Sequence, residues 1–270
     1  MSLAEDIGGG DYTSLACIPE NKRSEAKLFI KDEGILAGLT LAEDIFLYID
    51  PTLKCSFYRK DGDAAVNGDI AMKVSGNLRN ILMAERLVLN CIQRMSGIAT
   101  RTGVLAGLIE GLHAKLLDTR KTTPGLRFLE KWAVRIGGGY NHRFGLYDMV
   151  MIKDNHVDGV GGTRNAIEAV TKYLKENALA LKVEIEVRNQ NELDEVLSVG
   201  GIDRIMLDNY SPAALAEAVK LINGKYETEA SGGINEDNIR KYAMTGVDFI
   251  SSSAMTHSVK SLDLSLKVSG

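Results

Sequence analysis

The segment LKVEIEV (181–187) alternates apolar and acidic residues and is rich in β-branched side chains, which predicts a β-strand. RIMLDN (204–209) and DFISSSA (248–254) predict two further strands downstream. Helical patterns separate them, and SPAALAEAVKLING (211–224) is the clearest. Because strands that alternate with helices form parallel sheets, this half of the chain predicts a parallel α/β barrel.

Polar residues recur along this half of the chain at a nearly constant spacing. Glu186, Asp208, Glu229 and Ser251 are 22, 21 and 22 residues apart, and each is expected near the end of a strand. In α/β barrels the chemistry gathers at the carboxyl ends of the strands. The spacing therefore predicts an active site at that end of the barrel.

The first hundred residues follow a different pattern. They contain short predicted strands with glycine-rich turns and then a helix expected from about Asn77 to Met95, which indicates an α+β domain. We place a domain boundary near Ser96–Gly97. AKLLDT (114–119) and DMVMIKD (148–154) are expected to add two more strands to the barrel.

Composition narrows the class of protein. The 270 residues carry a net charge of −4, with 45% hydrophobic and 25% charged residues, typical of soluble globular proteins. This charge disfavours a general nucleic-acid or polybasic membrane partner. Three widely spaced cysteines indicate a reducing compartment, and no signal-peptide or membrane-spanning pattern is recognised. We expect a cytoplasmic enzyme.

Positive charge is concentrated in one part of this acidic chain. Residues 120–154 hold seven Lys or Arg against three Asp or Glu. Arg120 and Lys121 follow a predicted strand, Lys153 ends another, and His142–Arg143 lies in the glycine-rich stretch GGGYNHRFG. Such clustering suits a substrate with several negative charges, although a solvated basic face gives the same pattern.

Acidic residues are expected inside the barrel. Glu184 and Glu186 share one face of their strand, and the apolar face opposite should pack against helices. A buried acid needs a cation or metal partner, so Lys or Arg from neighbouring strands, or Mg²⁺, would serve. Asp208 raises the same question. Structural ion pairs inside the barrel are the alternative for each acid.

Two loops after the last strands predict a phosphate site. SGGI (231–234) is expected to precede a helix directly, where backbone N–H groups bind anions. SSSAMTHS (251–258) supplies hydroxyls and His257 one strand–helix unit later. Barrels commonly bind phosphate in this position.

As a set, the motifs EDIGGGDYTS, DTRKTTPGLR, GGGYNHRFGLYDMVMIKDNH, VEIEV, MLDN and EASGGI resemble the quinolinate phosphoribosyltransferase family along nearly the whole chain. The resemblance implies an N-terminal α/β-sandwich domain (1–97), to which the tail 259–270 returns, and an open seven-stranded α/β barrel (98–258). It also implies homodimers, with one subunit's N-terminal domain closing the other's barrel. The sequence leaves open whether dimers pair further into hexamers. Arg86 would then reach the partner's site, although its seven-residue spacing from Arg79 and Gln93 alone favours a solvent-facing stripe.

The implied reaction joins quinolinate to phosphoribosyl pyrophosphate (PRPP), with Mg²⁺, and yields nicotinate mononucleotide, pyrophosphate and CO₂ for NAD synthesis. By motif position, the quinolinate site comprises Arg86, Arg120, Lys121, His142, Arg143 and Lys153. The implied catalytic residues are Lys121, Lys153, Glu186 and Asp208, of which the two acids face the metal. The implied PRPP and phosphate residues are Ser231, Gly232, Gly233, Ser252, Ser253 and His257.

One position departs from the family pattern. Ser253 stands where the family usually has glycine, so its Cβ could crowd the phosphate or its hydroxyl could donate to it. A sister enzyme of the same fold with another pyridine or pyrimidine acceptor is the close alternative. The alternative from another class is a non-catalytic barrel that senses phosphorylated metabolites, which would have no reason to keep Lys121, Glu186 and Asp208 together.

Overall fold

The chain forms two compact units. In this computed structural model, which describes residues 2–269, one unit comprises the chain up to Gly103, Phe128–Gly138 and the segment from Ser258. The other comprises Val104–Arg127 and Gly139–His257. Residues 1 and 270 of the predicted terminal segments lie outside the described residues.

The first unit is built on an antiparallel sheet with the strand order β12–β1–β5–β3. Its strands are β1 (Arg23–Ile30), β3 (Lys54–Phe57), β5 (Ile70–Asn77) and β12 (Leu264–Val268). The helices of this unit are α1 (Ser2–Ile7), α2 (Tyr12–Cys17), α3 (Leu39–Ile49), the long α4 (Leu78–Leu108) and α5 (Arg127–Ile136). A short pair, β2 (Gly34–Ile35) and β4 (Ala64–Ala65), completes it.

The strand β1 shows why this sheet packs on helices. Ala26, Leu28 and Ile30 alternate with more exposed residues, so one face of the strand is buried. These side chains belong to a core that also contains Phe46 of α3 and Ile81 of α4. The same strand pairs with β5 on one side and with the C-terminal β12 on the other.

Helix α4 is longer than the sequence predicts. The expected end near Met95 is wrong, because the helix continues through Ser96–Gly97 to Leu108. Gly97 serves close packing here, since a Cβ would overlap the carbonyl oxygen of Lys260. Ser96 is buried, and its hydroxyl donates to the carbonyl of Ala37 and accepts from its N–H. The small residues therefore allow backbone segments to approach the helix and do not end it.

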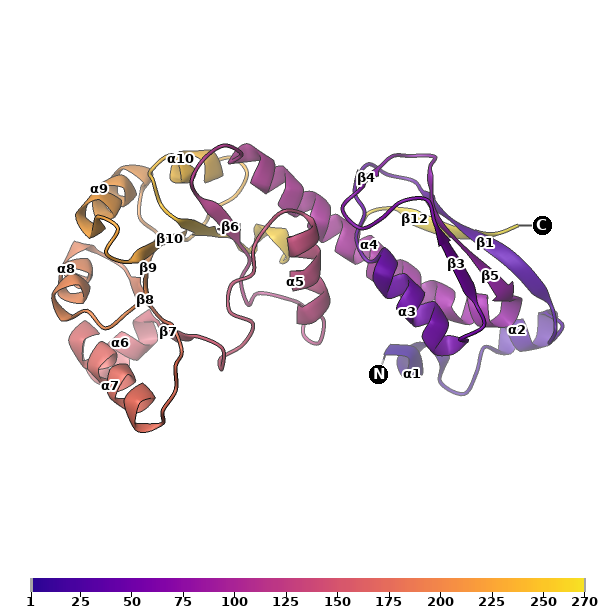
Figure 1. Ribbon diagram of the computed structural model, residues 1–270, viewed down its shortest axis with the longest axis horizontal. Coiled ribbons are helices and arrows are strands. Elements are labelled where there is room, and N and C mark those ends of the chain that lie inside the picture. Colours follow the sequence, from indigo (N-terminus) through magenta and orange to yellow (C-terminus); the bar gives the residue numbers. More distant parts are fainter. Residues whose placement is uncertain (1, 270) are drawn as a thin grey trace. The chain divides into compact units, whose positions relative to one another are not determined.

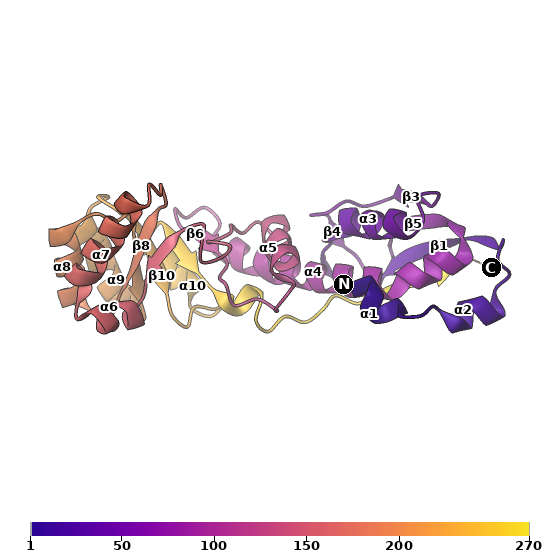
Figure 2. The ribbon, with the colours of Figure 1, turned by 90° about the horizontal axis from the view of Figure 1, so that it is seen from below.

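The second unit contains a six-stranded parallel sheet with the order β6–β11–β10–β9–β8–β7. Its strands are β6 (Lys115–Leu117), β7 (Val150–Ile152), β8 (Val183–Val187), β9 (Arg204–Asp208), β10 (Glu227–Ser231) and β11 (Phe249–Ser251). Its helices are α6 (Asp154–Val160), α7 (Thr163–Glu176), α8 (Gln190–Val199), α9 (Pro212–Ile222) and α10 (Ile239–Ala243), and a 3₁₀ turn spans Ser253–Met255. Figures 1 and 2 show α7, α8 and α9 on the outer side of the curved strands.

The seventh strand expected in the barrel is represented by a single bridging residue. Tyr140 forms an isolated parallel bridge with Leu117 at the free edge of β6. In the described part of the chain this segment does not pair with β7, so the sheet remains open. The alternating strands and helices and their parallel direction are as the sequence predicts.

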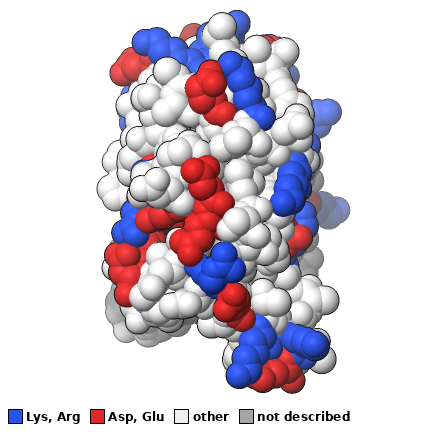
Figure 3. Space-filling view, turned by 90° about the vertical axis from the view of Figure 1, so that its left-hand side faces the viewer, with Lys and Arg blue, Asp and Glu red and all other residues white. Residues whose placement is uncertain are grey.

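The outer surface of this unit mixes both signs of charge. Basic and acidic side chains are interspersed over the face in Figure 3. Ion pairs one helical turn apart, such as Arg164–Glu168 on α7 and Lys220–Glu217 on α9, contribute to the mixture. Separately, no helix between residues 2 and 269 is long and apolar enough to cross a membrane.

Candidate active site

The carboxyl ends of neighbouring strands bring predicted site residues together. Lys153 follows β7, and its Nζ lies 3.0 Å from Oε2 of Glu186 on β8. Asp208 ends β9 and is paired in register with Ser231 at the end of β10. Glu186 is buried, whereas the Lys153 side chain is 44% exposed. This edge of the sheet therefore has both acidic groups and a cation that is accessible to a ligand.

The loop after β6 and the loop before β7 are joined by a buried acid that the sequence motifs alone do not single out. Asp118 has no exposed surface. Its Oδ1 accepts from the backbone N–H of His142 at 2.8 Å, and its Oδ2 accepts from Nδ2 of Asn141 at 2.6 Å. Asp118 is the first residue of DTRK, so its position directly after a predicted strand was the available signal. It fixes the turn that carries His142 and Arg143.

Two guanidinium groups lie near each other on these loops. Nη1 of Arg143 donates to the carbonyl of Met149 at 3.2 Å. Burial and the nearby charge of Arg120 lower the pKa of Arg143. Nε of Arg120 is buried, and no acceptor for it exists among residues 2–269. A buried donor without an acceptor, beside a second cation, suits an anionic ligand with a planar carboxylate.

Arg127 connects the same two loops, although in the sequence it is only one of the seven cations of the basic cluster. Its Nε donates to Oγ1 of Thr122 at 3.1 Å, and its Nη1 donates to the carbonyl of Phe144 at 3.0 Å. Its Nη2 also faces the carbonyl of Arg120 at 3.5 Å. One side chain thus contacts backbone or hydroxyl groups on both cation-bearing loops.

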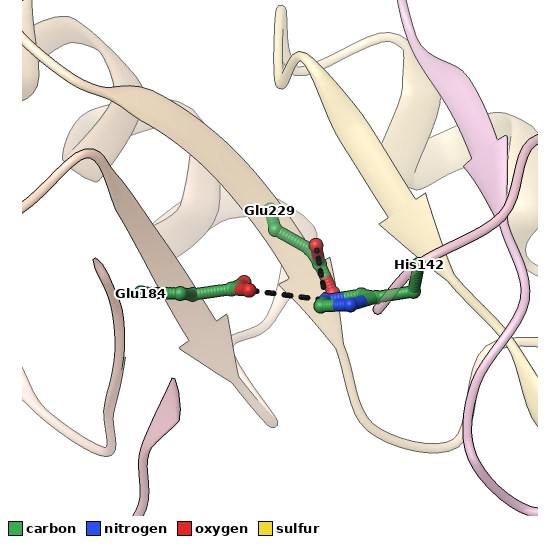
Figure 4. A group of neighbouring side chains, drawn as sticks. All are labelled: His142, Glu184 and Glu229. Atoms are coloured by element: carbon green, nitrogen blue, oxygen red, sulfur yellow. Dashed lines mark ion pairs between the residues drawn. The ribbon is translucent and has the colours of Figure 1, made fainter. Parts of the chain in front are cut away.

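His142 lies between two buried acids inside the barrel, as Figure 4 shows. Its Nε2 is 3.0 Å from Oε2 of Glu184 and 3.3 Å from Oε2 of Glu229. Burial lowers the pKa of His142, but the two carboxylates outweigh it and raise the pKa to about 9. The backbone N–H of Arg143 donates to Nδ1 of His142 at 2.6 Å, so Nδ1 serves as an acceptor, which disfavours a second ring proton on that nitrogen. This contact favours a ring with its proton on Nε2.

The acids around His142 have an additional cationic partner. Nη1 of Arg204 on β9 lies 3.0 Å from Oε2 of Glu229. Burial and the charge of Glu229 raise the pKa of Glu184 to about 7. Burial also acts to raise the pKa of Glu229, but the hydrogen bond from His142 and the charge of Arg204 lower it. The predicted need of Glu184 for a cationic partner is met by a histidine and an arginine.

Asp208 accepts a hydrogen bond from Asn209, a neighbour whose backbone is left-handed. Asn209 has a left-handed φ of 56°, and its Nδ2 donates to Oδ2 of Asp208 at 2.6 Å. Gly232 packs against this residue with a φ of 101°. A Cβ at Gly232 would lie 2.9 Å from the backbone nitrogen of Asn209 and would overlap its Oδ1. The position therefore requires glycine on grounds of both space and conformation.

The predicted phosphate loops differ in part from expectation. The helix expected directly after SGGI is wrong, because α10 begins only at Ile239 and has five residues. Its dipole therefore cannot supply the predicted anion site. The hydroxyl of Ser252 is engaged within the protein, since it donates to the carbonyl of Ile234 at 2.6 Å. This bond ties the loop after β11 to the loop after β10.

The departure at Ser253 causes no backbone strain. The positive-φ residues other than glycine among residues 2–269 are Ala178, Asn209 and Asn223, so Ser253 adopts a conformation open to any residue. Its carbonyl accepts from the N–H of His257 at 2.9 Å. His257 is exposed beside Ser253, at the end of this loop.

Two further contacts bear on predicted residues. Lys121 is exposed, and its carbonyl accepts from Oγ1 of Thr256 at 2.8 Å, which joins its loop to the loop after β11. In the other unit, Arg79 and Gln93 make internal bonds, to the carbonyls of Ile18 and Leu264 respectively. Arg86 is exposed and makes no ion pair within the described residues. The predicted stripe on α4 is thus divided between structural residues and one accessible arginine.

A parallel α/β barrel with cations and acids gathered at its strand ends has the architecture of a barrel enzyme whose active site lies at that end and suits an anionic substrate. The family model for the quinolinate phosphoribosyl transferase C-terminal domain matches residues 98–267, and the model for the N-terminal domain matches residues 11–96. The chain belongs to the quinolinate phosphoribosyl transferase family.

Curated relatives match over almost the whole chain. A chloroplastic nicotinate-nucleotide pyrophosphorylase (carboxylating) of Arabidopsis thaliana is 49% identical over 99% of this chain and 81% of its own length. A probable nicotinate-nucleotide pyrophosphorylase of Bacillus subtilis is 43% identical over 98% of this chain and 90% of its own.

Solved structures agree with the fold. NadC from Streptococcus pyogenes is 39% identical, with a TM-score of 0.93 over 99% of this chain and 94% of that chain. The nicotinate-nucleotide pyrophosphorylase from Francisella tularensis is 41% identical, with a TM-score of 0.91 over 99% of this chain and 93% of that chain.

Proposed function

We propose that this chain is a decarboxylating quinolinate phosphoribosyltransferase of NAD synthesis. It transfers the phosphoribosyl group of PRPP to quinolinate and releases pyrophosphate and CO₂. Family membership over both domains and relatives named for this reaction support the assignment. The structural observation that carries it is the buried, unpaired Nε of Arg120 beside Arg143, because quinolinate has two adjacent carboxylates.

The quinolinate site is assigned to the loops after β6 and before β7. Arg120 and Arg143 would each bind a carboxylate with a planar guanidinium, which can donate two parallel hydrogen bonds. His142 lies next to Arg143, and Lys153 adds a cation from the end of β7. Lys121, whose side chain is exposed on the loop after β6, would contact quinolinate or the pyrophosphate of PRPP.

The PRPP site is assigned to the ends of β8 to β11. Glu186 and Asp208 offer carboxylate oxygens at neighbouring strand ends, which are the ligands that Mg²⁺ prefers. These two residues would hold the ion, and bound Mg²⁺ would neutralise part of the pyrophosphate charge. The 5′-phosphate would lie at the two loops that the Ser252 hydroxyl ties together. Its proposed residues are Ser231, Gly232, Gly233, Ser252, Ser253 and His257.

The proposed reaction needs no covalent enzyme nucleophile. The bond from ribose C1 to the pyrophosphate oxygen breaks, and the electron pair leaves with pyrophosphate beside Lys121 and Lys153. Positive charge builds on the ribose, where Glu186 and Asp208 stabilise it electrostatically. The quinolinate nitrogen then forms the bond to C1. Loss of CO₂ from the carbon next to that nitrogen leaves an electron pair, which the cationic ring stabilises until a proton replaces it.

An assay with purified protein tests this proposal. Nicotinate mononucleotide, pyrophosphate and CO₂ should form in equal amounts, and only when PRPP, Mg²⁺ and quinolinate are all present. Product from nicotinate without CO₂ would indicate the sister enzyme with another acceptor. Binding of phosphorylated metabolites with no product from any acceptor would indicate the sensor.

We further propose a homodimer in which Arg86 serves the partner subunit's site. Arg86 is the exposed member of its stripe on α4, whereas Arg79 and Gln93 are used internally. Mixing an inactive Arg86→Ala protein with an inactive Lys153→Ala protein should restore partial activity, because mixed dimers contain one intact site. Confirmed mixed dimers without activity would contradict the shared site. A hexamer would appear as a larger species in sedimentation.

The proposed location is the cytoplasm or another reducing compartment. All three cysteines are free, and Cys91 and Cys55 are partly buried. Burial raises the pKa of both thiols, which keeps them protonated and unreactive. Some plant relatives are named as chloroplastic or mitochondrial proteins, so fluorescence imaging of the tagged chain in its own cells would test the location.

A further inference from the structure

Three buried side chains converge inside the barrel next to the proposed quinolinate site. Glu184 and Glu229 have no exposed surface, and the His142 side chain is 5% exposed. Both carboxylates face the same ring nitrogen, Nε2, from two different strands (Figure 4). Neither oxygen of Glu184 accepts a hydrogen bond of standard geometry within residues 2–269. The ring is therefore the close partner on which this buried acid depends.

A metal ion is a less suitable occupant of this cluster than a ring proton. The three ligand atoms lie within 4.8 Å of one another, which is close enough to share an ion. However, Oε2 of Glu229, the oxygen that faces His142, is already 3.0 Å from Nη1 of Arg204. A divalent cation bound to that oxygen would lie directly beside the guanidinium. An Nε2–H group lies within ion-pair distance of both acids, at 3.0 and 3.3 Å, without this repulsion.

The other ring nitrogen faces the proposed substrate-binding residue. Nδ1 of His142 accepts from the backbone N–H of Arg143 at 2.6 Å, while the N–H of His142 donates to Asp118. The orientation of the imidazole thus sets the position of the Arg143 backbone. Because Glu184 and Glu229 both contact Nε2, they restrict rotation of the imidazole about its Cβ–Cγ bond.

We propose that Glu184 and Glu229 are positioning residues that orient His142 and, through its Nδ1, place Arg143 for the dicarboxylate. This inference rests on the proposed function. Both acids are buried and face the histidine ring, so each acts through the histidine. Arg204 completes the arrangement by balancing the charge of Glu229 from the neighbouring strand.

The test compares Glu184→Gln and Glu229→Gln with the control Glu227→Gln. Glu227 also pairs with Arg204, at 3.1 Å, but it is 39% exposed and does not contact His142. Loss of a carboxylate that orients a metal-binding histidine costs roughly 10- to 100-fold in affinity or activity, and we use the same scale for His142. We expect the KM for quinolinate to rise by about that factor in the two test variants. The KM for PRPP should change by less than about twofold, and the control should match the wild type in both.

A second comparison separates a positioning role from loss of folding. If Glu229 acts through His142, the double variant Glu229→Gln/His142→Asn should be no worse than His142→Asn alone. Glu184→Asp, which keeps the charge, should retain more quinolinate affinity than Glu184→Gln. If Glu184→Gln does not fold, Glu184→Asp replaces it in the comparison, and its KM for quinolinate should rise by a smaller factor. Additive losses, or equal increases in both KM values, would overturn the proposal.

One readout does not depend on activity. In ¹⁵N-histidine-labelled protein without ligand, the His142 ring, assigned with His142→Asn, should carry its proton on Nε2. An unprotonated Nε2, or one equivalent of divalent metal that is lost in Glu184→Gln, would overturn the proposal. A wild-type protein that forms no product but shows this ring signal would refute the proposed function and leave the ring arrangement standing. Activity with an unprotonated Nε2 would refute the positioning role alone.

Discussion

Replacing Gly232 by alanine should damage the protein much more than the same change one residue later. Gly232 has a φ of 101° and faces the Asn209 backbone, whereas Gly233 has a φ of 61° and no atom within 4 Å of an added Cβ. Gly233→Ala therefore costs only its left-handed backbone, about 1–2 kcal/mol. Gly232→Ala adds overpacking against Asn209, which typically costs about 1–3 kcal/mol more.

The difference between the two variants is large enough to measure by thermal unfolding. An extra destabilisation of about 2 kcal/mol lowers the Tm of a domain of this size by roughly 4–8 °C. Gly232→Ala should accordingly unfold that much below Gly233→Ala in differential scanning calorimetry. Its KM for PRPP should also rise, since Asn209 holds the carboxylate of Asp208.

A double variant identifies the obstacle. Asn209→Gly tolerates the left-handed φ of 56° and removes the overlapping Oδ1. Introducing Gly232→Ala into that background should therefore cost less than it does in the wild type. The backbone nitrogen 2.9 Å away remains, so recovery should be partial. Equal Tm values for Gly232→Ala and Gly233→Ala would refute the packing argument.

Other expected outcomes follow from single contacts. Arg120→Ala should raise the KM for quinolinate roughly 10- to 100-fold, because charged hydrogen bonds contribute about 1.5–3 kcal/mol. Steady-state kinetics should show little change in the KM for PRPP. Equal effects on both substrates would contradict the assignment. Burial raises the pKa of Asp248, but hydrogen bonds from His113 and Thr228 outweigh it and lower the pKa. Asp248→Asn should therefore lose about 1 kcal/mol of stability at pH 7, a small value because the carboxylate is about one-third exposed. A carboxylate whose pKa is lowered in the folded state stabilises the protein at pH values above its ordinary pKa of 3.8. The difference in unfolding free energy between wild type and Asp248→Asn, measured by urea unfolding, should therefore shrink as the pH falls below 3.8. A difference independent of pH would contradict the argument. Ser253→Gly should weaken PRPP binding by less than about tenfold, or about 1.4 kcal/mol, through loss of a hydroxyl; tighter binding would show instead that the Cβ crowds the phosphate.

The barrel was predictable because its strands carry their own signals. VEIEV is buried along its whole length in β8, and α9 begins after Ser211, whose hydroxyl accepts from the N–H of Ala214 as a helix cap. The end of α4 was not predictable from local sequence. Gly97 looks like a helix stop, yet its role depends on Lys260, which is distant in the chain.

The site likewise contains residues that could be predicted from the sequence and residues that could not. Acids at strand ends follow from periodicity, and the Lys153–Glu186 ion pair joins two residues that the motifs had singled out. The partners of Glu184 could not be identified in advance, because His142 reaches it from a loop and Arg204 lies on another strand. Such pairs are fixed by three-dimensional packing and not by spacing along the chain. Arg127 and Asp118 were missed because they bond to loop backbones, whose path the sequence does not specify.

The pairing of β12 with β1 has a consequence for biosynthesis. The strand β1 leaves the ribosome long before its edge partner β12, because Leu264, where β12 begins, lies 234 residues after Ile30. At about 5–20 residues per second, the interval between them is roughly 10–50 s. During this interval the edge of β1 that β12 later covers presents unpaired backbone groups, to which nascent-chain chaperones can bind. The sheet that begins with β1 is therefore completed late in synthesis, and a stalled or truncated message would release it with an unpaired edge strand, which favours aggregation.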